Sequence, residues 1–335
     1  MEFVASMIIN LFNWSWNLFL REEVEPFDWE NLPLDLKIII IEQLDQETRK
    51  NLKVCSKNTR LLVNNVPFVI SRLEYDAPPR DFIAIRIMIG EECEVFTQDR
   101  KIVKTTSKYN GKEFVTNETF QREACNRMRM LMDRNGVEDL RIHLECLTNE
   151  DIQNIPYFNI RKLKHIRIST GLIGRYGKQQ IEIVDDIMDR IPYGMESFQF
   201  YCDPDSISCP YKYHKKINSV KQLIRCRNIK INDEMLGDIQ ATKVYIQSNE
   251  VSLDGVFRFI KLRMEELKYT YFEFRMNHLS LSEDQMVREV DDGLKKLFRA
   301  TNRDIDGYDY KMNDSKMMCR LEILGSCLKG EVKAK

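Results

Sequence analysis

Residues 27–66 read FDWENLPLDLKIIIIEQLDQETRKNLKVCSKNTRLLVNNV, and this stretch decides the fold of the first domain. Leu32-Pro33 predicts the start of a helix, because a proline's missing N–H costs nothing in the first turn. Asp45 can end this helix and cap a second one. Aliphatic residues share one face of the first helix at four-residue spacing, namely Leu36, Ile40 and Leu44, with Ile41 beside them.

The rest of this stretch predicts a second and a third helix. Leu52, Cys55 and Leu62 supply their apolar side, and Pro67 closes the block because it disfavours helix in the preceding residue. Three helices in about 40 residues bury little surface by themselves, so such a unit needs a partner or a neighbouring domain. Aliphatic side chains that stay partly exposed on it indicate a protein interface.

The ordered motifs of this block resemble the F-box. They are Leu32-Pro33, Ile40-Ile41-x-x-Leu44 followed by Asp45, Val54-Cys55-Ser56-Lys57, and Leu61-Leu62-Val63. The Cys-Ser-Lys form followed by Leu-Leu-Val looks most like the large F-box families of nematodes. The resemblance covers about 40 of the 335 residues at the level of motifs.

The resemblance implies a non-catalytic adaptor of a cullin–RING (SCF-type) ubiquitin ligase, with a cytoplasmic and/or nuclear location. Its F-box would bind the Skp adaptor, and its C-terminal region would recruit a target protein. The sequence departs from many F-boxes at Arg49, where an aliphatic residue is common, and at Asn58, where tryptophan is common. Carried over by position, the Skp-binding residues are Leu32, Pro33, Leu36, Ile40, Ile41, Leu44 and Leu52.

The composition is that of a folded, reduced protein. Hydrophobic residues make up 43% and charged residues 31%, and the formal net charge is -1. Such a balance does not indicate nucleic acid as a partner. The nine cysteines are odd in number and scattered, with no CxxC pair, which favours an intracellular chain over a secreted disulfide framework. The length predicts roughly two domains, or one small domain and a repeat array.

Residues 3–20 carry no charge, and their polar residues fall on one helical stripe. One interpretation is an amphipathic helix that packs on its own protein. The other is a helix in a membrane interface, although the stripe lacks the Lys and Arg that attract anionic lipid. We therefore divide the chain into an N-terminal helix and linker (1–26), an F-box (27–67), a strand-rich segment with a helix (68–136) and a β/α region (137–335).

Beyond residue 137, short alternating apolar strands recur with helical stretches between them. Ser252 is predicted to cap one helix, and Ser282 with Gln285 forms a capping box before another. The fold class is therefore α+β, an all-α F-box followed by an irregular leucine-rich-repeat-like region. A two-layer α/β domain with a mixed sheet is the alternative. The predicted strands contain Leu140/Ile142/Leu144, Ile166/Ile168, Phe198/Phe200/Cys202, Ile229/Ile231, Val244/Ile246, Phe272/Phe274 and Leu321/Ile323.

Several other motifs lack the spacing that their chemistry needs. Gly171–Lys178 is glycine-rich but fits neither a P-loop nor a dinucleotide fingerprint, so nucleotide binding is only an alternative hypothesis. Residues 211–216 (YKYHKK) interleave aromatic and basic residues without a second patch in register. The spacing of one thiol-rich set matches no usual zinc pattern: Cys202, Cys209, His214 and Cys226.

The four histidines form no catalytic set, so we expect no catalytic residue, cofactor or metal. His143 lies on the strand face opposite Ile142, which predicts a surface position. The alternative function is a Skp-independent interaction scaffold, associated with membranes through residues 3–20.

Overall fold

The structure is a computed structural model, and it describes the chain in two compact units. The first unit comprises Met1–Val69 with Arg134–Gly136, and the second comprises Ile70–Asp133 and Val137–Lys335. The described residues are 29–67, 69–76, 84–89, 92–97, 104–105, 114–115, 120–143, 162–170, 177–202, 213–276, 282–297, 299–304, 307–311, 317–324 and 326–334.

The first unit contains α2 (Leu34–Gln43), α3 (Gln46–Leu52) and α4 (Lys57–Asn65). Each helix begins where the sequence offers a start signal. Pro33 precedes α2, and the side chains of Asp45 and Ser56 cap α3 and α4 by accepting from the backbone N–H groups of Thr48 and Thr59. These caps satisfy donors that the helix itself leaves open, so the three predicted helices form.

The core of this helical unit is a small aliphatic cluster. Ile41 of α2 packs with Val63 of α4 and with Val66, and all three side chains are buried. Trp29 extends the cluster, and its indole Nε1 donates to the Thr59 hydroxyl at 3.2 Å. The partly buried residues around this cluster are Trp29, Ile38, Leu52 and Leu62.

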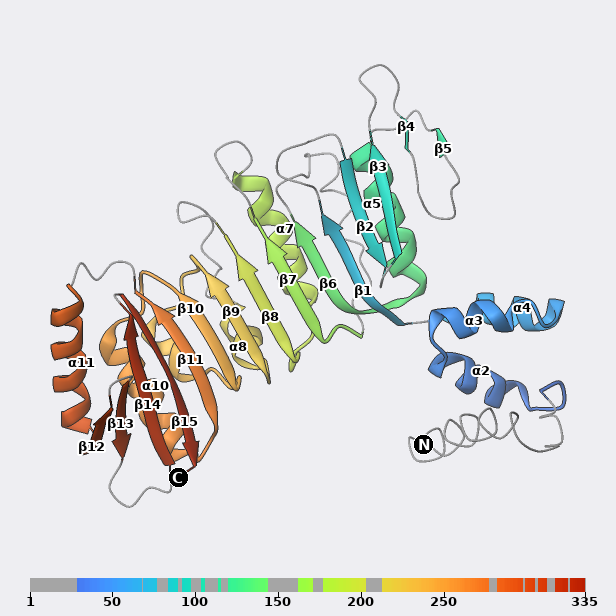
Figure 1. Cartoon of the computed structure of the whole chain (residues 1–335). Helices are drawn as coiled ribbons and strands as arrows, with labels where there is room; N and C mark the ends of the chain where they lie inside the picture. Colours follow the sequence, from blue (N-terminus) through green and yellow to red (C-terminus); the bar gives the residue numbers. More distant parts are fainter. Residues whose placement is uncertain are drawn as a thin grey trace. The chain divides into compact units, whose positions relative to one another are not determined.

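The second unit is organised by one thirteen-stranded mixed sheet, in the order β12-β13-β14-β15-β11-β10-β9-β8-β7-β6-β1-β2-β3 (Figure 1). A separate two-stranded sheet pairs β4 (Lys104–Thr105) with β5 (Phe114–Val115). The strands of the large sheet are β1 (Val69–Asp76), β2 (Ala84–Ile89), β3 (Glu92–Thr97), β6 (Gly136–His143), β7 (His165–Ser169), β8 (Ser197–Tyr201), β9 (Leu223–Arg227), β10 (Lys243–Gln247), β11 (Thr270–Arg275), β12 (Arg299–Asp304), β13 (Gly307–Lys311), β14 (Met317–Leu324) and β15 (Cys327–Ala334).

The six central strands, β6 to β11, are parallel and lie side by side in chain order. Aligned positions on successive strands follow one another at 26, 32, 26, 20 and 28 residues. At the two ends of the sheet the strands pair antiparallel, between β1, β2 and β3 at one end and from β11 through β15, β14 and β13 to β12 at the other. The fold is thus α+β with a mixed sheet.

Helices cover one face of the parallel strands, and Figure 1 shows α7, α8 and α10 behind them. The rings of Phe272 and Phe274 on β11 meet Phe259 of α10 edge to face, at 6.0 and 5.4 Å between centroids. Burial of these apolar strand residues, at roughly 25 cal/mol per Å², holds the two layers together. The helices of this unit are α5 (Phe120–Arg134), α7 (Gly177–Arg190), α8 (His214–Asn218), α9 (Asp233–Gly237), α10 (Leu253–Glu265) and α11 (Glu283–Leu297).

Six of the seven strands predicted beyond residue 137 are present, namely β6, β7, β8, β10, β11 and β14, and the predicted caps of α10 and α11 form. The hydroxyl of Ser252 caps α10, and Ser282 and Gln285 form the predicted capping box, with backbone donors at 3.0 and 3.3 Å. The strand predicted at Ile229/Ile231 is wrong. Those side chains are buried in the segment after β9, and the strand itself is formed by Leu223–Arg227. Residues 68–136 and 137–335, expected as separate domains, both contribute strands to the large sheet.

Candidate functional site

The helical unit divides its aliphatic residues between a core and an outer stripe. Ile41 is fully buried and Ile38 packs beside it, whereas Leu36 and Leu44 stay half-buried outside the core cluster. Ile40 joins the outer stripe with 8% of its surface exposed. Because four helical residues turn through about 400°, Leu36 and Ile40 lie above one another on α2, and Leu44 follows directly as the residue that ends the helix.

The other predicted docking residues are Leu32 and Pro33, which precede α2, and Leu52, which ends α3. Leu32 is half-buried and Pro33 is exposed at the start of α2. Leu52 packs against the core cluster instead. Three aliphatic side chains that the sequence analysis did not name among the docking residues are also exposed, with fractions of 59%, 75% and 63%: Leu34, Val54 and Leu61.

Arg49 is buried, although its position suggested an aliphatic residue. Its guanidinium donates to the carbonyl oxygens of Leu44, Val66 and Pro67 at 3.2, 3.0 and 3.2 Å. Burial lowers the pKa of this guanidinium, and the charge of Glu42 opposes that shift. The departure from the F-box pattern therefore serves the fold: Arg49 ties the end of α2 to the segment that follows α4.

The second candidate surface is the face of the sheet that α10 and its neighbours do not cover. Alternate residues of each parallel strand point to it, and the strands pair so that these residues align in three rows. We call these eighteen positions the open face. Its rows are Asp139, His165, Ser197, Leu223, Lys243, Tyr271; Arg141, Arg167, Gln199, Arg225, Tyr245, Glu273; and His143, Ser169, Tyr201, Arg227, Gln247, Arg275.

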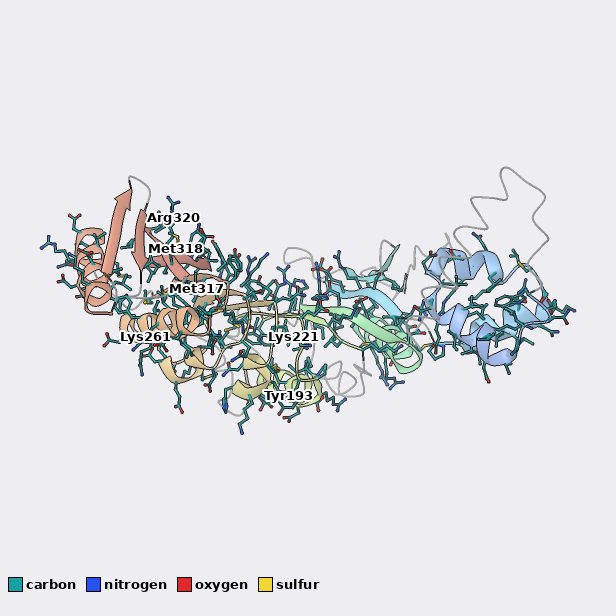
Figure 2. The ribbon with its side chains drawn as sticks, turned by 90° about the horizontal axis from the view of Figure 1, so that it is seen from below. Tyr193, Lys221, Lys261, Met317, Met318 and Arg320 are labelled. Atoms are coloured by element: carbon teal, nitrogen blue, oxygen red, sulfur yellow. The ribbon has the colours of Figure 1, made fainter. Side chains whose placement is uncertain are left out.

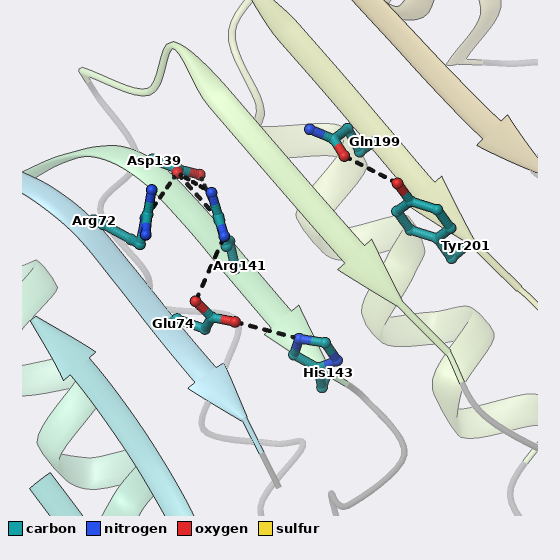
Figure 3. A network of polar contacts seen from close by, with 7 residues as sticks. All are labelled: Arg72, Glu74, Asp139, Arg141, His143, Gln199 and Tyr201. Atoms are coloured by element: carbon teal, nitrogen blue, oxygen red, sulfur yellow. Dashed lines mark hydrogen bonds and ion pairs between the residues drawn. The ribbon is translucent and has the colours of Figure 1, made fainter. Parts of the chain in front are cut away.

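At the β6 end of the open face, the charges form a closed network with β1 (Figure 3). Arg141 lies 3.0 Å from Asp139 and 3.7 Å from Glu74, and Arg72 lies 3.3 Å from the same aspartate. Nε2 of His143 lies 3.6 Å from Glu74, so the predicted surface position of this histidine is confirmed. Each acid of this network lies beside a base, so this end of the open face offers little unpaired charge to a ligand.

The middle of the open face, on β7 to β10, carries cations without acids. Arg167 lies over the ring of Tyr201 at 4.9 Å, and Arg225 lies over the ring of Tyr245 at 4.4 Å. Burial lowers the pKa of Arg225, but its interactions with Tyr201 and Tyr245 together outweigh burial, so the pKa is raised. Within the described residues, no ion pair engages the four cations of this region, Arg167, Arg225, Arg227 and Lys243.

A shallow depression of about 240 Å³ lies at the carboxyl ends of β8 to β11. Tyr201, Arg225, Arg227 and Tyr245 line it, and Arg275 borders it on β11. Arg275 is already paired with Glu273 at 3.0 Å. The uncompensated part of the depression is therefore its β8–β10 side.

The other motifs considered from the sequence do not assemble where they are described. Cys202 is buried and its thiol donates to the Asn228 carbonyl at 2.8 Å, while Cys226 lies on β9 and not at a helix end. Among the described residues, no group of three potential ligands could hold a metal. Tyr213 is a core residue that donates to the Asp185 carbonyl, and Lys216 donates to the Met188 carbonyl at the end of α7. The aromatic–basic cluster thus supports packing between α7 and α8.

Other predictions lie outside the described residues. They concern the apolar helix at 3–20, the segment 144–161 and most of the glycine-rich stretch 171–178, of which Gly177 starts α7. No helix in the described part of the chain is long and apolar enough to cross a membrane.

Comparison with known families identifies the helical unit. Residues 29–71 match the family model of the F-box domain, so the chain carries an F-box domain at its N-terminal side. No curated protein and no solved structure matches the chain. At the level of the family, an F-box domain marks a Skp-binding adaptor of SCF-type ubiquitin ligases, generally a non-catalytic subunit.

Proposed function

We propose that this chain is a substrate-recruiting subunit of an SCF-type ubiquitin ligase, which binds Skp through residues 29–66 and a target protein through its sheet. The observation that carries the proposal is the F-box domain itself, with aliphatic residues outside its core. The adaptor needs no chemistry of its own. Holding a target beside the ligase raises the effective concentration of the two reacting partners.

The Skp-binding surface consists of the outer stripe of α2 and the residues that precede it. Leu32, Pro33, Leu36, Ile40 and Leu44 make direct contact. Ile41 and Leu52, expected among the docking residues, act by packing in the core beneath them. Leu34 and Val54, both exposed, add to the rim. Burying one leucine or isoleucine contributes roughly 1.5–3 kcal/mol, about ten- to a hundredfold in affinity.

A binding measurement with purified Skp and the full chain tests the docking surface. The variant Leu36→Asp should abolish detectable Skp binding, because a carboxylate would be buried without a partner at the interface. The matched control is Leu267→Asp, which places the same charge at an exposed leucine of the second unit and should leave the affinity unchanged within about twofold.

Circular dichroism of both variants shows whether each is folded, and hydrogen exchange of α2 to α4 reports on the helical unit. Wild-type affinity in a folded Leu36→Asp variant would exclude this stripe as the docking surface. Absence of Skp binding by the parent chain would instead favour a Skp-independent interaction scaffold.

We infer further that β6 to β11, with their helices, form an irregular leucine-rich-repeat-like array. Chain-order parallel strands, one helix-covered face and spacings of 20 to 32 residues support it. In such an array the face without helices is the natural place for a target. Cytoplasmic and/or nuclear action belongs to the same proposal.

A further inference from the structure

We propose that the target is held through an extended, unphosphorylated segment rich in aspartate and glutamate, bound across β7 to β10 of the open face. This inference deepens the proposed function, because it names the chemistry that the target-binding surface recognises. It rests on three features of the open face: its charge, its aromatic partners and the spacing of its cations.

The charge of the open face is strongly uneven. Its eighteen positions include six Lys or Arg residues and two acids, a formal charge of +4, whereas the whole chain carries -1. Both acids are engaged with arginines, Asp139 with Arg141 and Glu273 with Arg275. The unmatched cations therefore gather on β7 to β10, where an acidic segment would find complementary charge.

The tyrosines argue for carboxylates and against the bases of a nucleic acid. Tyr245 has Arg225 on one side at 4.4 Å and the ring of Tyr271 nearby at 5.4 Å. Tyr201 is covered by Arg167. Bases bind single-strand platforms by stacking on free aromatic faces, and an arginine already occupies one face of each of these two rings. An arginine stacked by its flat face still offers its N–H edge, which fits a planar carboxylate.

The spacing of the cations favours several single charges over one doubly charged phosphate. Arg167 and Arg225 occupy the same row two strands apart, roughly 10 Å at about 4.8 Å per strand. Arg225 and Arg227 are alternate residues of one strand, about 7 Å apart along it. An extended peptide with acids at every second residue carries its carboxylates at a similar spacing of about 7 Å.

Fluorescence anisotropy with the full chain tests the proposal with three labelled twelve-residue peptides. One alternates glutamate with glycine, and the second has glutamine in place of glutamate. The third has three phosphoserines in place of the six glutamates, so that with each phosphate doubly ionised its net charge is about the same as that of the first. We expect the glutamate peptide to bind at least about tenfold more tightly than the glutamine peptide, and more weakly as salt rises. It should bind at least as well as the phosphoserine peptide.

Three variants localise the binding. Arg225→Gln and Arg167→Gln should each weaken binding of the glutamate peptide about five- to tenfold, since each removes one charged contact. The matched control is Lys261→Gln on α10, the helix that packs on the opposite face of the sheet, and it should change nothing (Figure 2). Circular dichroism establishes that the variants are folded.

Each contrary outcome overturns the proposal. Equal affinity for the glutamate and glutamine peptides would show that the open face does not select an acidic segment. Absence of binding at millimolar glutamate peptide would show the same. At least tenfold tighter binding of the phosphoserine peptide, or of a twelve-nucleotide single-stranded RNA, assigns the face to another ligand. Skp binding measured on the same samples tests the adaptor function separately from the acidic-segment inference. If the chain binds Skp but not the glutamate peptide, only this inference is refuted. If the parent chain does not bind Skp, the adaptor role is refuted.

Discussion

Arg49 is the residue at which the helical unit departs most clearly from an aliphatic pattern. A buried charge is costly unless hydrogen bonds satisfy it, and here three carbonyl oxygens do so. The acceptors are carbonyls near helix ends, which would otherwise lack partners. The buried charge of Arg49 therefore stabilises the helical unit through these three hydrogen bonds.

Replacement of Arg49 should destabilise the helical unit. We expect Arg49→Ala to lower its free energy of unfolding by about 2–4 kcal/mol, because buried carbonyls lose their donors. Arg49→Leu should not restore stability, since an aliphatic side chain donates nothing. Hydrogen exchange of α3 and α4 in the full chain measures the change.

Arg60 provides the matched control, because it also donates to a backbone carbonyl, that of Lys53, but at an exposed site. Arg60→Ala should cost less than about 1 kcal/mol. Equal losses for the Arg49→Ala and Arg60→Ala variants would show that burial gives the Arg49 contacts no special weight.

At the scale of elements, β15 depends on a glycine. Gly330 is buried and pairs with Phe272 on β11 and with Leu321 on β14. A side-chain carbon at this position would come within 3 Å of the Arg320 carbonyl and of both neighbouring side chains. Only a residue without a Cβ allows β15 to lie between β11 and β14 at this point.

Gly330→Val should therefore lower the stability of the second unit by about 2–3 kcal/mol through overpacking. Chemical denaturation followed by exchange of the β14 and β15 amides measures this. Gly237→Ala in α9 is the comparison, because a Cβ there meets nothing within 4 Å. It should be neutral or stabilising by up to about 1 kcal/mol. A Gly330→Val variant as stable as the parent would mean that the strands adjust freely.

Local signals predicted the helical unit and the helix caps well. Asp45, Ser252 and Ser282 each act within three residues of themselves, so the sequence contains the whole interaction. The strand at Leu223–Arg227 was missed although Ile224 and Cys226 alternate with polar neighbours, because Ile229 and Ile231 just beyond it show the same alternation. The buried position of Arg49 depends on carbonyls seventeen and eighteen residues away, which no local pattern reveals.

The open face could not be predicted from any single segment. Arg167 and Tyr201 are thirty-four positions apart in the sequence, and only the pairing of β7 with β8 brings them together. Five of the six parallel strands contribute one or two cations and β8 contributes none, so each strand looks like an ordinary solvated face when it is taken alone. The positive region arises from the alignment of neighbouring strands.

At the scale of the molecule, charge is segregated. With +4 on the open face and -1 overall, the remainder of the chain carries a formal -5. An acidic segment is therefore disfavoured over most of the surface and attracted to one place. Helices α2 to α4 lie in the first compact unit and the open face lies in the second, so the two proposed binding surfaces use separate residues.

We expect Skp and an acidic peptide to bind independently. Calorimetric titration of Skp into the full chain, with and without saturating glutamate peptide, should give affinities within about twofold of each other, because the two surfaces share no residue. The same should hold for peptide binding to the Leu36→Asp variant. A change of tenfold or more would reveal energetic coupling between the two units.

The unshifted pairing of six parallel strands has a practical consequence for protein engineering. Because helix-facing residues supply the packing, the eighteen outward positions form a grid whose spacing is fixed by the backbone. Exchanging a residue at a grid point therefore changes the group that is presented there, while the backbone spacing of the other positions is kept. With the target site proposed above, the sheet would serve as a template on which the bound target is specified position by position.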